Sequence, residues 1–367
     1  MTRNIVLCCD GTANEFARDR TNVVKLFHAL VHDPDAQATY YHPGVGTMEA
    51  VGAVTTVGRK VTKVLGLAIG YGLETDIRDA YVFLMNHFKE GDRLFLFGFS
   101  RGAYTVRCVS ALLHMYGLIR PGNEPLVPYA IRMMMAITGL SERKGPQNEI
   151  AGYFKLADEF KQHFGGQRCQ PHFVGVWDTV SSVGWIENPL RLPFTADNPD
   201  IAIGRHAIAL DERRAFFRTN LWRPSTNGGP RDLKQVWFPG VHCDVGGGYP
   251  EAESGLSKIA LQWMVDEAKD AKLLVDPGRE DLVLGRAGGG YVPPDPKAMM
   301  HESLTGAWRL VEYVPKRHYN AKRKMEERRM NLSRYRTIPP GASIHRSAYE
   351  RGAEYKAGLE RRMTGEA

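Results

Sequence analysis

The chain has 367 residues and a net charge of +7, and 43% of its residues are hydrophobic. These values are typical of a globular protein that is long enough to bury a full core without disulfide staples. The longest candidate for a membrane helix, Ile131 to Gly139, has about nine residues, whereas roughly 20 are needed to cross a bilayer. The sequence therefore predicts no transmembrane segment.

The first apolar run, Ile5 to Cys9, ends at Asp10, and no small-residue cleavage site follows it. This run is too short for the core of a signal peptide, so we interpret it as a first strand. Without a signal peptide or a membrane segment, the sequence predicts a cytoplasmic protein. Export by a signal-independent secretion system remains an alternative.

Short apolar runs alternate with amphipathic stretches along the chain, which predicts an α/β protein with a largely parallel central sheet. The expected strands cover residues 4–9, 38–41, 93–99, 173–177 and 235–241. The expected helices cover residues 22–31, 75–88, 103–115, 208–217 and 256–271. Residues 276–300 are rich in Pro and Gly and predict a loop, and mostly short helical pieces are expected after them.

Residues 120–168 interrupt this alternation and contain helical fragments at 129–137 and 153–163. A segment inserted between two sheet strands often forms a cap, so we expect a helical cap here. Its three methionines, Met133 to Met135, suit either contact with an acyl chain or an ordinary helix core. We expect a single domain over residues 1–350, with 351–367 as a C-terminal tail that frays.

The five cysteines have an odd number and irregular spacing, and no C-x-x-C pair occurs among them: Cys8, Cys9, Cys108, Cys169 and Cys243. This pattern predicts a reducing compartment, and neither a disulfide framework nor a zinc site.

Much of the positive charge lies between Lys316 and Arg336, where nine Lys and Arg residues accompany only Glu326 and Glu327. Such a run is typical of a solvated helix face. The alternative is a surface attracted to an anionic membrane, through peripheral contact of residues 316–336. No nucleic-acid-binding motif accompanies the run, so we expect no nucleic acid as a partner.

The strongest motif is the sequence Gly98-Phe99-Ser100-Arg101-Gly102, which lies between a buried strand and a helix. G-x-S-x-G in this context indicates a nucleophile elbow, in which Ser100 projects above the sheet from a strained turn. Gly98 and Gly102 are required because larger residues would clash in so tight a turn. The alternative is an ordinary strand–helix turn with a capping serine.

Serine is a poor nucleophile unless a base and an orienting acid activate it. Two later strands end near Asp178 and His242, and the carboxyl ends of parallel strands meet at one edge of the sheet. The order Ser100, Asp178, His242 is the order of α/β-hydrolases. His345 is the alternative base, and Asp244 is a weaker alternative acid that more simply fixes the loop after His242.

An oxyanion needs two donors. We expect one from the backbone N–H of Arg101 and the other from Gly11 or Thr12, with Asp10 holding that loop.

A further possibility is that the carboxylates Asp10, Asp178 and Asp244 converge with His242 on a hard cation. The elbow serine argues against a metal as the main mechanism, so we expect no metal.

These motifs also resemble those of a known family, the DUF2235 family, which is described as the catalytic domain of Tle1-like type VI secretion phospholipase effectors. The resemblance is carried by 98–104 (GFSRGAY) and 242–249 (HCDVGGGY), together with 10–12 and Asn14, 41–47, 176–180, 209–214, 303–306, 313–315 and 344–347. It implies an α/β-hydrolase core with a Ser-Asp-His triad at Ser100, Asp178 and His242, His345 being the alternative base. For the effectors of the family, it implies phospholipase activity on membrane glycerophospholipids.

The sequence thus predicts a serine hydrolase that cleaves carboxylic esters of lipids or phospholipids through an acyl-enzyme and needs no cofactor. One alternative is a hydrolase of a small soluble ester. The other is a catalytically inactive binding module on the same fold. The oligomeric state is left open.

Overall fold

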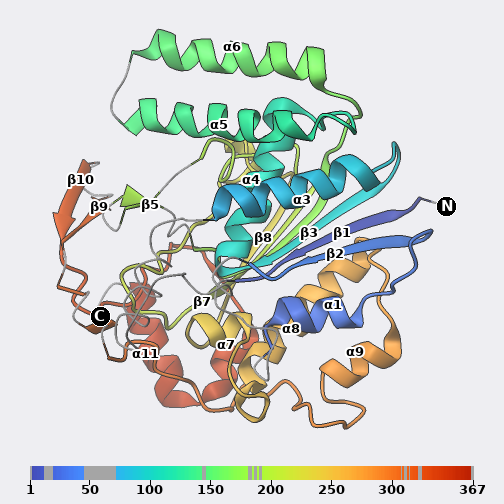
Figure 1. The fold of residues 1–367 in the computed structure, drawn as a ribbon. Helices are drawn as coiled ribbons and strands as arrows, with labels where there is room; N and C mark the ends of the chain where they lie inside the picture. The colour runs from blue at the N-terminus through green and yellow to red at the C-terminus, as the bar shows by residue number, and fades with distance from the viewer. Residues whose placement is uncertain are drawn as a thin grey trace, which may run out of the picture.

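A computed structural model describes residues 2–11, 20–44, 72–142, 146–180, 184–185, 188–189, 192–306, 308–309, 312–313, 315–320 and 325–364. Its centre is a seven-stranded sheet in the order β11-β8-β7-β4-β3-β1-β2, in which all neighbours pair in parallel. Helices cover both faces of this sheet (Figure 1). The prediction of an α/β-hydrolase-like fold is therefore confirmed.

The strands of the central sheet are β1 (Asn4–Cys9), β2 (Gln37–His42), β3 (Arg93–Phe99), β4 (Pro171–Trp177), β7 (Ile203–Ala209), β8 (Asp232–Phe238) and β11 (Ser343–Ile344). Two small antiparallel pairs are β5 (Gly184–Trp185) with β6 (Asn188–Pro189), and β9 (Lys316–Asn320) with β10 (Met325–Arg329). The α-helices are α1 (Asn22–Ala29), α3 (Leu73–His87), α4 (Ser100–Tyr116), α5 (Val127–Glu142), α6 (Gln147–Phe164), α7 (His242–Gly246), α8 (Gly255–Asp270), α9 (Pro277–Val283) and α11 (Ala353–Thr364). The single turns of 3-10 helix are η1 (Glu124–Leu126), η2 (Ser225–Asn227), η3 (Glu251–Glu253) and η4 (Arg346–Arg351).

The two faces of the sheet bury alternate residues of each strand, as the two-residue period of a strand requires. In β1, Ile5 and Leu7 belong to the core cluster beneath α3, α4 and α5, whereas Val6 and Cys8 belong to the cluster beneath α1, α8 and α9. Because strands such as β1 are buried on both faces, they are apolar throughout, and that is why β1 and β3 can be located from the sequence to the residue.

The order in which strands are added to the sheet reverses beside β1, and the candidate site lies at this point. From β1 the chain first adds β2 on one side and then crosses to add β3 on the other. In open parallel sheets such a switch point opens a crevice at the carboxyl ends of the flanking strands. Asp10, Ser100 and Asp178 directly follow β1, β3 and β4, so they share this edge.

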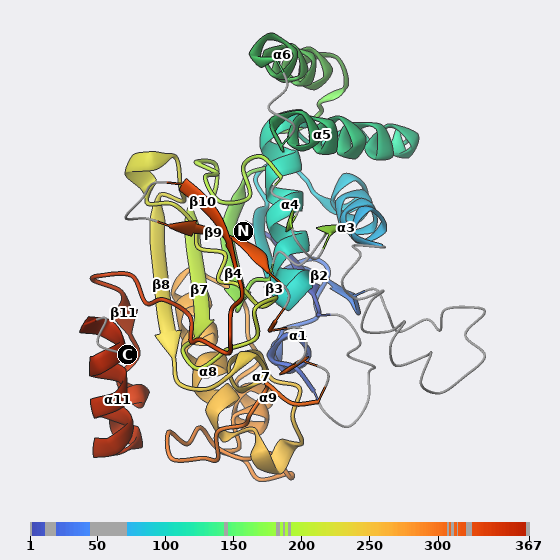
Figure 2. The same ribbon diagram turned by 90° about the vertical axis from the view of Figure 1, so that its left-hand side faces the viewer.

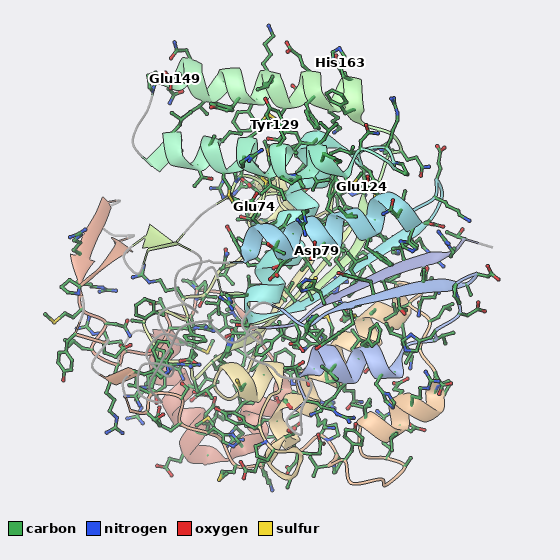
Figure 3. All side chains as sticks on the ribbon, viewed as in Figure 1. Glu74, Asp79, Glu124, Tyr129, Glu149 and His163 are labelled. Carbon is green, nitrogen blue, oxygen red and sulfur yellow. The ribbon has the colours of Figure 1, made fainter. Side chains whose placement is uncertain are left out.

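The helices α5 and α6 form an antiparallel pair at the far end of α4 from Ser100. Tyr116 packs its ring against Phe160, and Lys161 donates to the carbonyl of His114, so the contacts are with the last turn of α4. A helix of this length spans about 25 Å. Met133 and Met134 are buried in the cluster shared with α3 and α4. Figure 3 shows Tyr129 between the two helices, with Glu149 and His163 on α6.

The prediction of a helix over 208–217 is wrong, because the segment contains the end of strand β7 and then a loop. Its Ala, Leu, Glu and Arg residues favour a helix by propensity. Instead, the Glu212 carboxylate accepts hydrogen bonds from the N–H groups of Arg213 and Arg214, and the Asp211 carboxylate accepts one from Gly240. These acidic side chains therefore bind backbone N–H groups of the loop. The apolar residues that precede them are buried as part of the sheet.

Three predictions for the C-terminal third are also wrong. Residues 276–300 contain α9, which begins with Asp276 as a capping residue and Pro277 in its first turn. The basic run 316–336 does not form the predicted helix face, because its described residues form the hairpin β9–β10 and the segment after it. The segment that was expected to fray contains α11, which packs Leu359 into a small cluster with Trp237 beside β11 (Figure 2).

Candidate functional site

Ser100 lies in a sharp turn between β3 and α4. Its φ is +57°, in the left-handed region that non-glycine residues rarely adopt. A Cβ on Gly102 would lie 2.1 Å from the carbonyl oxygen of Cys9, and a Cβ on Gly98 would lie 2.5 Å from that of Gly102. Neither position can hold a larger residue without movement of the backbone, so the two glycines allow the end of β1 to approach the start of α4.

Ser100, His242 and Asp178 form a continuous chain of hydrogen bonds. The Nε2 atom of His242 lies 2.9 Å from the Oγ atom of Ser100, and the Nδ1 atom lies 2.5 Å from the Oδ2 atom of Asp178. A carboxylate beside Nδ1 fixes the proton on that nitrogen, which leaves Nε2 to accept a proton from the serine hydroxyl. The three side chains are buried, and Ser100 is 9% exposed.

His242 is placed by a turn that the sequence did not reveal. β8 ends at Phe238 rather than at Val241, and Gly240 at φ +108° redirects the chain so that His242 begins α7. The rings of Phe99 and Phe217 lie 4.6 Å and 4.8 Å from the imidazole, centroid to centroid. These aromatic contacts restrict the ring of His242 to the orientation that meets both partners.

The electrostatics of this chain of residues follow from burial and from one arginine. Burial alone raises the pKa of the Asp178 carboxyl, but the Arg336 guanidinium and the hydrogen bond from His242 outweigh it and hold that pKa well below its ordinary value. Burial lowers the pKa of His242, and the opposing effect of Asp178 does not fully compensate. The imidazole is therefore neutral, and the carboxylate charged, near neutral pH.

The loop after β1 adjoins the turn at Ser100. Asp10 accepts hydrogen bonds from the hydroxyls of Thr21 and Tyr41, at 2.7 Å and 2.9 Å. The N–H of Gly11 donates to the same carboxylate at 2.7 Å. Asp10 thus fixes the loop, and the Gly11 N–H already has an acceptor. Thr12, the other expected donor, lies outside the described residues.

Arg101, the expected oxyanion donor that follows Ser100, lies in the first turn of α4. Its backbone N–H is at the positive end of the helix dipole. Its guanidinium is buried, and burial lowers the pKa of Arg101 to about 10 while Asp76 opposes the shift.

Asp244 and His345, the alternative acid and the alternative base, make contacts outside the chain of hydrogen bonds at Ser100. The Asp244 carboxylate accepts from the N–H of Val241 and from the ring of His301, at 3.0 Å and 2.6 Å, and so ties the first turn of α7 to a later segment. His345 caps η4 through Ser347 and stacks on Phe238 at 4.6 Å.

The structure also brings together residues that the sequence reasoning did not assign to the site. The buried Glu212 accepts from the backbone N–H of His242 at 3.2 Å and pairs with Arg214 at 2.9 Å. Arg214 in turn lies over the ring of Phe217, at 3.5 Å. Two signals pointed to this segment: the acidic and basic run at 211–214, which its helix propensity assigned to a helix, and the place of 209–214 among the motifs of the family resemblance.

Arg336 is the second missed residue. It was counted in the basic run that was interpreted as solvated or membrane-facing, yet its side chain is 7% exposed and binds both oxygens of Asp178. Composition alone does not distinguish such a buried arginine from its exposed neighbours.

The carboxylates that were considered as cation ligands are each held by protein donors, as described above for Asp10, Asp178 and Asp244. Among the described residues, no group of three or more His, Cys, Asp or Glu is arranged to hold a metal ion. All five cysteines are free thiols. No helix in the described part of the chain is long and apolar enough to cross a membrane.

The fold and the placement of Ser100 after β3 define an α/β-hydrolase-like protein. A model of the family described as "T6SS, Phospholipase effector Tle1-like, catalytic domain" matches residues 3–267. The chain belongs to this family, which confirms the resemblance seen in its motifs.

The chain is also similar to a yeast protein and to a bacterial protein of known structure. The uncharacterized protein YEL023C of Saccharomyces cerevisiae is 35% identical over 230 residues, which are 60% of this chain and 33% of the yeast protein. The match thus spans about a third of the length of that curated relative. An uncharacterized protein from Pseudomonas aeruginosa, known from a crystal structure, is 21% identical, with a TM-score of 0.43 over 76% of this chain and 47% of that chain.

Proposed function

We propose that the protein is a serine hydrolase that cleaves acyl esters of lipids by a Ser-His-Asp mechanism. The observation that carries the proposal is the chain of hydrogen bonds from Ser100 through His242 to Asp178, in which each distance lies between 2.5 and 2.9 Å. Membership in a phospholipase effector family supports a lipid as the source of the ester.

In this mechanism His242 removes the proton of Ser100 as the Oγ atom attacks the ester carbonyl. Asp178 stabilises the imidazolium that forms, because its carboxylate remains charged beside Nδ1. The proton on Nε2 then passes to the departing alcohol, and an acyl-enzyme remains on Ser100. A water molecule activated by His242 hydrolyses the acyl-enzyme and restores the starting state. No cofactor takes part in these steps.

The oxyanion is stabilised at the start of α4. The backbone N–H of Arg101 is one donor, and Gly11 or Thr12 in the loop after β1 supplies the other. The close contact of Gly102 with the carbonyls of Cys9 and Asp10 supports this placement, because it brings that loop against the first turn of α4. The Gly11 N–H must leave the Asp10 carboxylate to serve, so Thr12 is the simpler choice.

A fluorophosphonate probe tests the nucleophile. We expect the native protein to be labelled and Ser100→Ala to lose the label together with hydrolysis of p-nitrophenyl esters. Ser110→Ala is the matched control, because Ser110 lies in the same helix and only bonds the carbonyl of Val106. An unlabelled native protein would contradict the proposal and favour a binding module.

The preferred length of the acyl chain distinguishes a lipid hydrolase from a hydrolase of small soluble esters. A lipid hydrolase hydrolyses long-chain esters and releases fatty acid from phospholipid vesicles, as followed by thin-layer chromatography of native and Ser100→Ala protein. A hydrolase of small soluble esters prefers short chains and leaves the vesicles intact.

A surface near the basic hairpin supports contact with an anionic membrane. Tyr313, Met330 and Leu332 are 63%, 42% and 49% exposed. Arg328 and Arg329, which precede Met330, are also exposed. Exposed basic residues beside exposed apolar side chains are attracted to an anionic membrane surface.

The backbone around Leu332 strengthens this interpretation. Leu332 and Ser333 have φ of +51° and +59°, an unfavourable conformation for a leucine whose side chain lies in water. The buried Glu312 fixes the strained turn by accepting from Ser333 N–H and from Asn331. The turn therefore holds an apolar side chain outward beside basic residues, as membrane-surface segments do.

Vesicle sedimentation tests this contact. The double variant Met330→Asp/Leu332→Asp is expected to bind phosphatidylglycerol vesicles at least several-fold more weakly than the native protein, with hydrolysis of a soluble ester unchanged. Met299→Asp serves as a control because Met299 is 61% exposed in a different segment. Equal loss in the control, or binding to RNA instead of vesicles, would contradict the assignment.

A further inference from the structure

Arg336 makes a two-pronged contact with the carboxylate that orients His242. Its Nη1 atom lies 2.5 Å from Oδ1 of Asp178, and its Nη2 atom lies 3.0 Å from Oδ2. The guanidinium also donates to the carbonyl oxygens of Ala209 and Phe217, at 3.1 Å and 2.9 Å. With a second bond from Nη2 to the carbonyl of Phe217, five hydrogen bonds fix a side chain that is 7% exposed.

This bidentate contact depends on the planar guanidinium group of arginine. Arginine matches both oxygens of a carboxylate, whereas a lysine presents a single point of charge. Asp178 has a third fixed donor, the N–H of Ala209, at 3.0 Å from Oδ1. With Arg336 and His242 also bound, both oxygens of the carboxylate are held, and the carboxyl group cannot rotate away from the imidazole.

Arg336 reaches the site from a distant part of the chain. It lies 158 positions after Asp178, in the segment between β10 and β11, which can be followed in Figure 2. The family match ends at residue 267, so this arginine lies outside the matched region.

We propose that Arg336 is a positioning residue, which holds the Asp178 carboxylate toward His242 and neutralises part of its charge. The inference rests on the proposed function, because it concerns the same three side chains. Two consequences follow for the reaction. The imidazole is kept in line with Ser100, and it remains unprotonated to a lower pH than beside a solitary carboxylate.

The other charged groups around His242 do not replace this effect. Glu212 and Arg214 pair with each other, so their charges largely cancel at the imidazole. His206 accepts a hydrogen bond from the N–H of Thr179, the residue after Asp178. Burial holds the pKa of His206 well below its ordinary value, so this imidazole is neutral. Arg336 is therefore the cation that directly compensates Asp178.

The test compares Arg336→Lys and Arg336→Ala with Arg334→Ala, an exposed arginine of the same segment. The readout is the pH profile of kcat/KM on a soluble p-nitrophenyl ester. In Arg336→Ala we expect kcat to fall about 10- to 100-fold with little change in KM, because the Asp178–His242 geometry loosens. The acid limb should move to higher pH by about one unit, because a neighbouring positive charge is gone.

Chemical rescue separates positioning from folding. Guanidinium ion at millimolar concentration is expected to restore part of the activity of Arg336→Ala, and Arg336→Lys should fall between that variant and the native protein. A folded Arg336→Ala with the native acid limb, or with no response to guanidinium, overturns the inference. If Arg336→Ala does not fold, Arg336→Gln, which removes the charge but keeps a polar side chain, decides by the same pH profile.

A second measurement does not depend on activity. In the Ser100→Ala background, the imidazole resonances of His242 are titrated by NMR with and without Arg336→Gln, which removes the positive charge. A raised His242 pKa supports the inference, and an unchanged one contradicts it. Absence of ester hydrolysis by the native protein would overturn the proposed function but leave this titration decisive for Arg336.

Discussion

At the scale of single residues, the site depends on a few positions where the backbone is strained or unusually close. Ser100 and Asp178 have φ of +57° and +37°, and both directly follow a strand of the sheet. Such conformations persist only where the surroundings fix them. Around Ser100 that constraint comes from Gly98 and Gly102, which leave no room for a side chain.

This close approach leads to a prediction for Gly102→Ala. A methyl group 2.1 Å from the Cys9 carbonyl must displace the start of α4 or the end of β1, so the free energy of unfolding should fall by about 1–3 kcal/mol. Gly139→Ala in α5 is the control, because nothing lies within 4 Å of its added methyl and the change should stabilise by about 0.5–1 kcal/mol. Denaturant unfolding measures both, and a Gly102→Ala protein as stable as the native one would contradict the packing described.

Sequence reasoning reached these residues unevenly. Ser100, Asp178 and His242 could be predicted because each follows an apolar run, and parallel strands bring their carboxyl ends together. Arg336 could not, because Asp178 lies 158 positions before it. Glu212 could not, because its bond to the backbone of His242 spans 30 positions and its own segment has the composition of a helix. A buried ion pair leaves no local pattern when one member lies within a run of exposed charges.

At the scale of elements, α7 carries His242 and is fixed by a histidine from another segment. His301 bridges two carboxylates: its Nδ1 atom lies 2.6 Å from Asp244 in α7, and its Nε2 atom lies 2.9 Å from Glu253 in η3. The ring of Tyr249 stacks on it at 3.6 Å. Burial lowers the pKa of His301, but its bonds to Glu253 and Asp244 outweigh this and raise it above the ordinary value.

The raised pKa gives the stabilisation a defined pH dependence. A histidine with a raised folded pKa contributes fully below its unfolded pKa of about 6.5, and the contribution is lost as pH rises through the folded value. His301→Gln should therefore lower Tm more at pH 5.5 than at pH 9, by about 2–4 °C. His163→Gln on α6 is the control, and an equal loss at both pH values would exclude the charged bridge.

The boundaries of the strands show which of them can be located from local sequence patterns alone. β1 and β3 were predicted to the residue because both faces of the sheet bury them, whereas β11 has two residues and gives no periodic signal. The strand β7 was missed because Gly204, Arg205 and His206 interrupt its apolar run. Arg205 is accommodated there by Glu267 and Asp232, which no local window reveals.

At the scale of the molecule, segments after the family match support the face that carries the site. Ser303 donates to Glu212, and Tyr355 and Arg362 bind Asp211, whose carboxylate accepts from Gly240. The core cluster beneath α1 and α8 also includes Val283 and Leu284 of the later segment. The C-terminal third is thus part of the same folded unit as the sheet.

A chain truncated after residue 267 should therefore fail to fold cooperatively. It would expose the apolar surface that Val283 and Leu284 cover and would lack the bonds that Ser303, Tyr355 and Arg362 make to Glu212 and Asp211. We expect a single thermal transition for the full chain and no such transition, with rapid proteolysis, for the truncated one. A truncated protein that unfolds cooperatively would show that the later segments are an independent addition.

The spacing of the site residues along the chain has a consequence for biosynthesis. Ser100 meets His242 across 142 positions, and Asp178 meets Arg336 across 158. A polypeptide emerging from the ribosome cannot bring these groups together until most of it has been made, since long loops must close first. The contacts among Ser100, His242, Asp178 and Arg336 are therefore completed only late in synthesis, after the segment that carries Arg336 has left the ribosome and packed against the sheet.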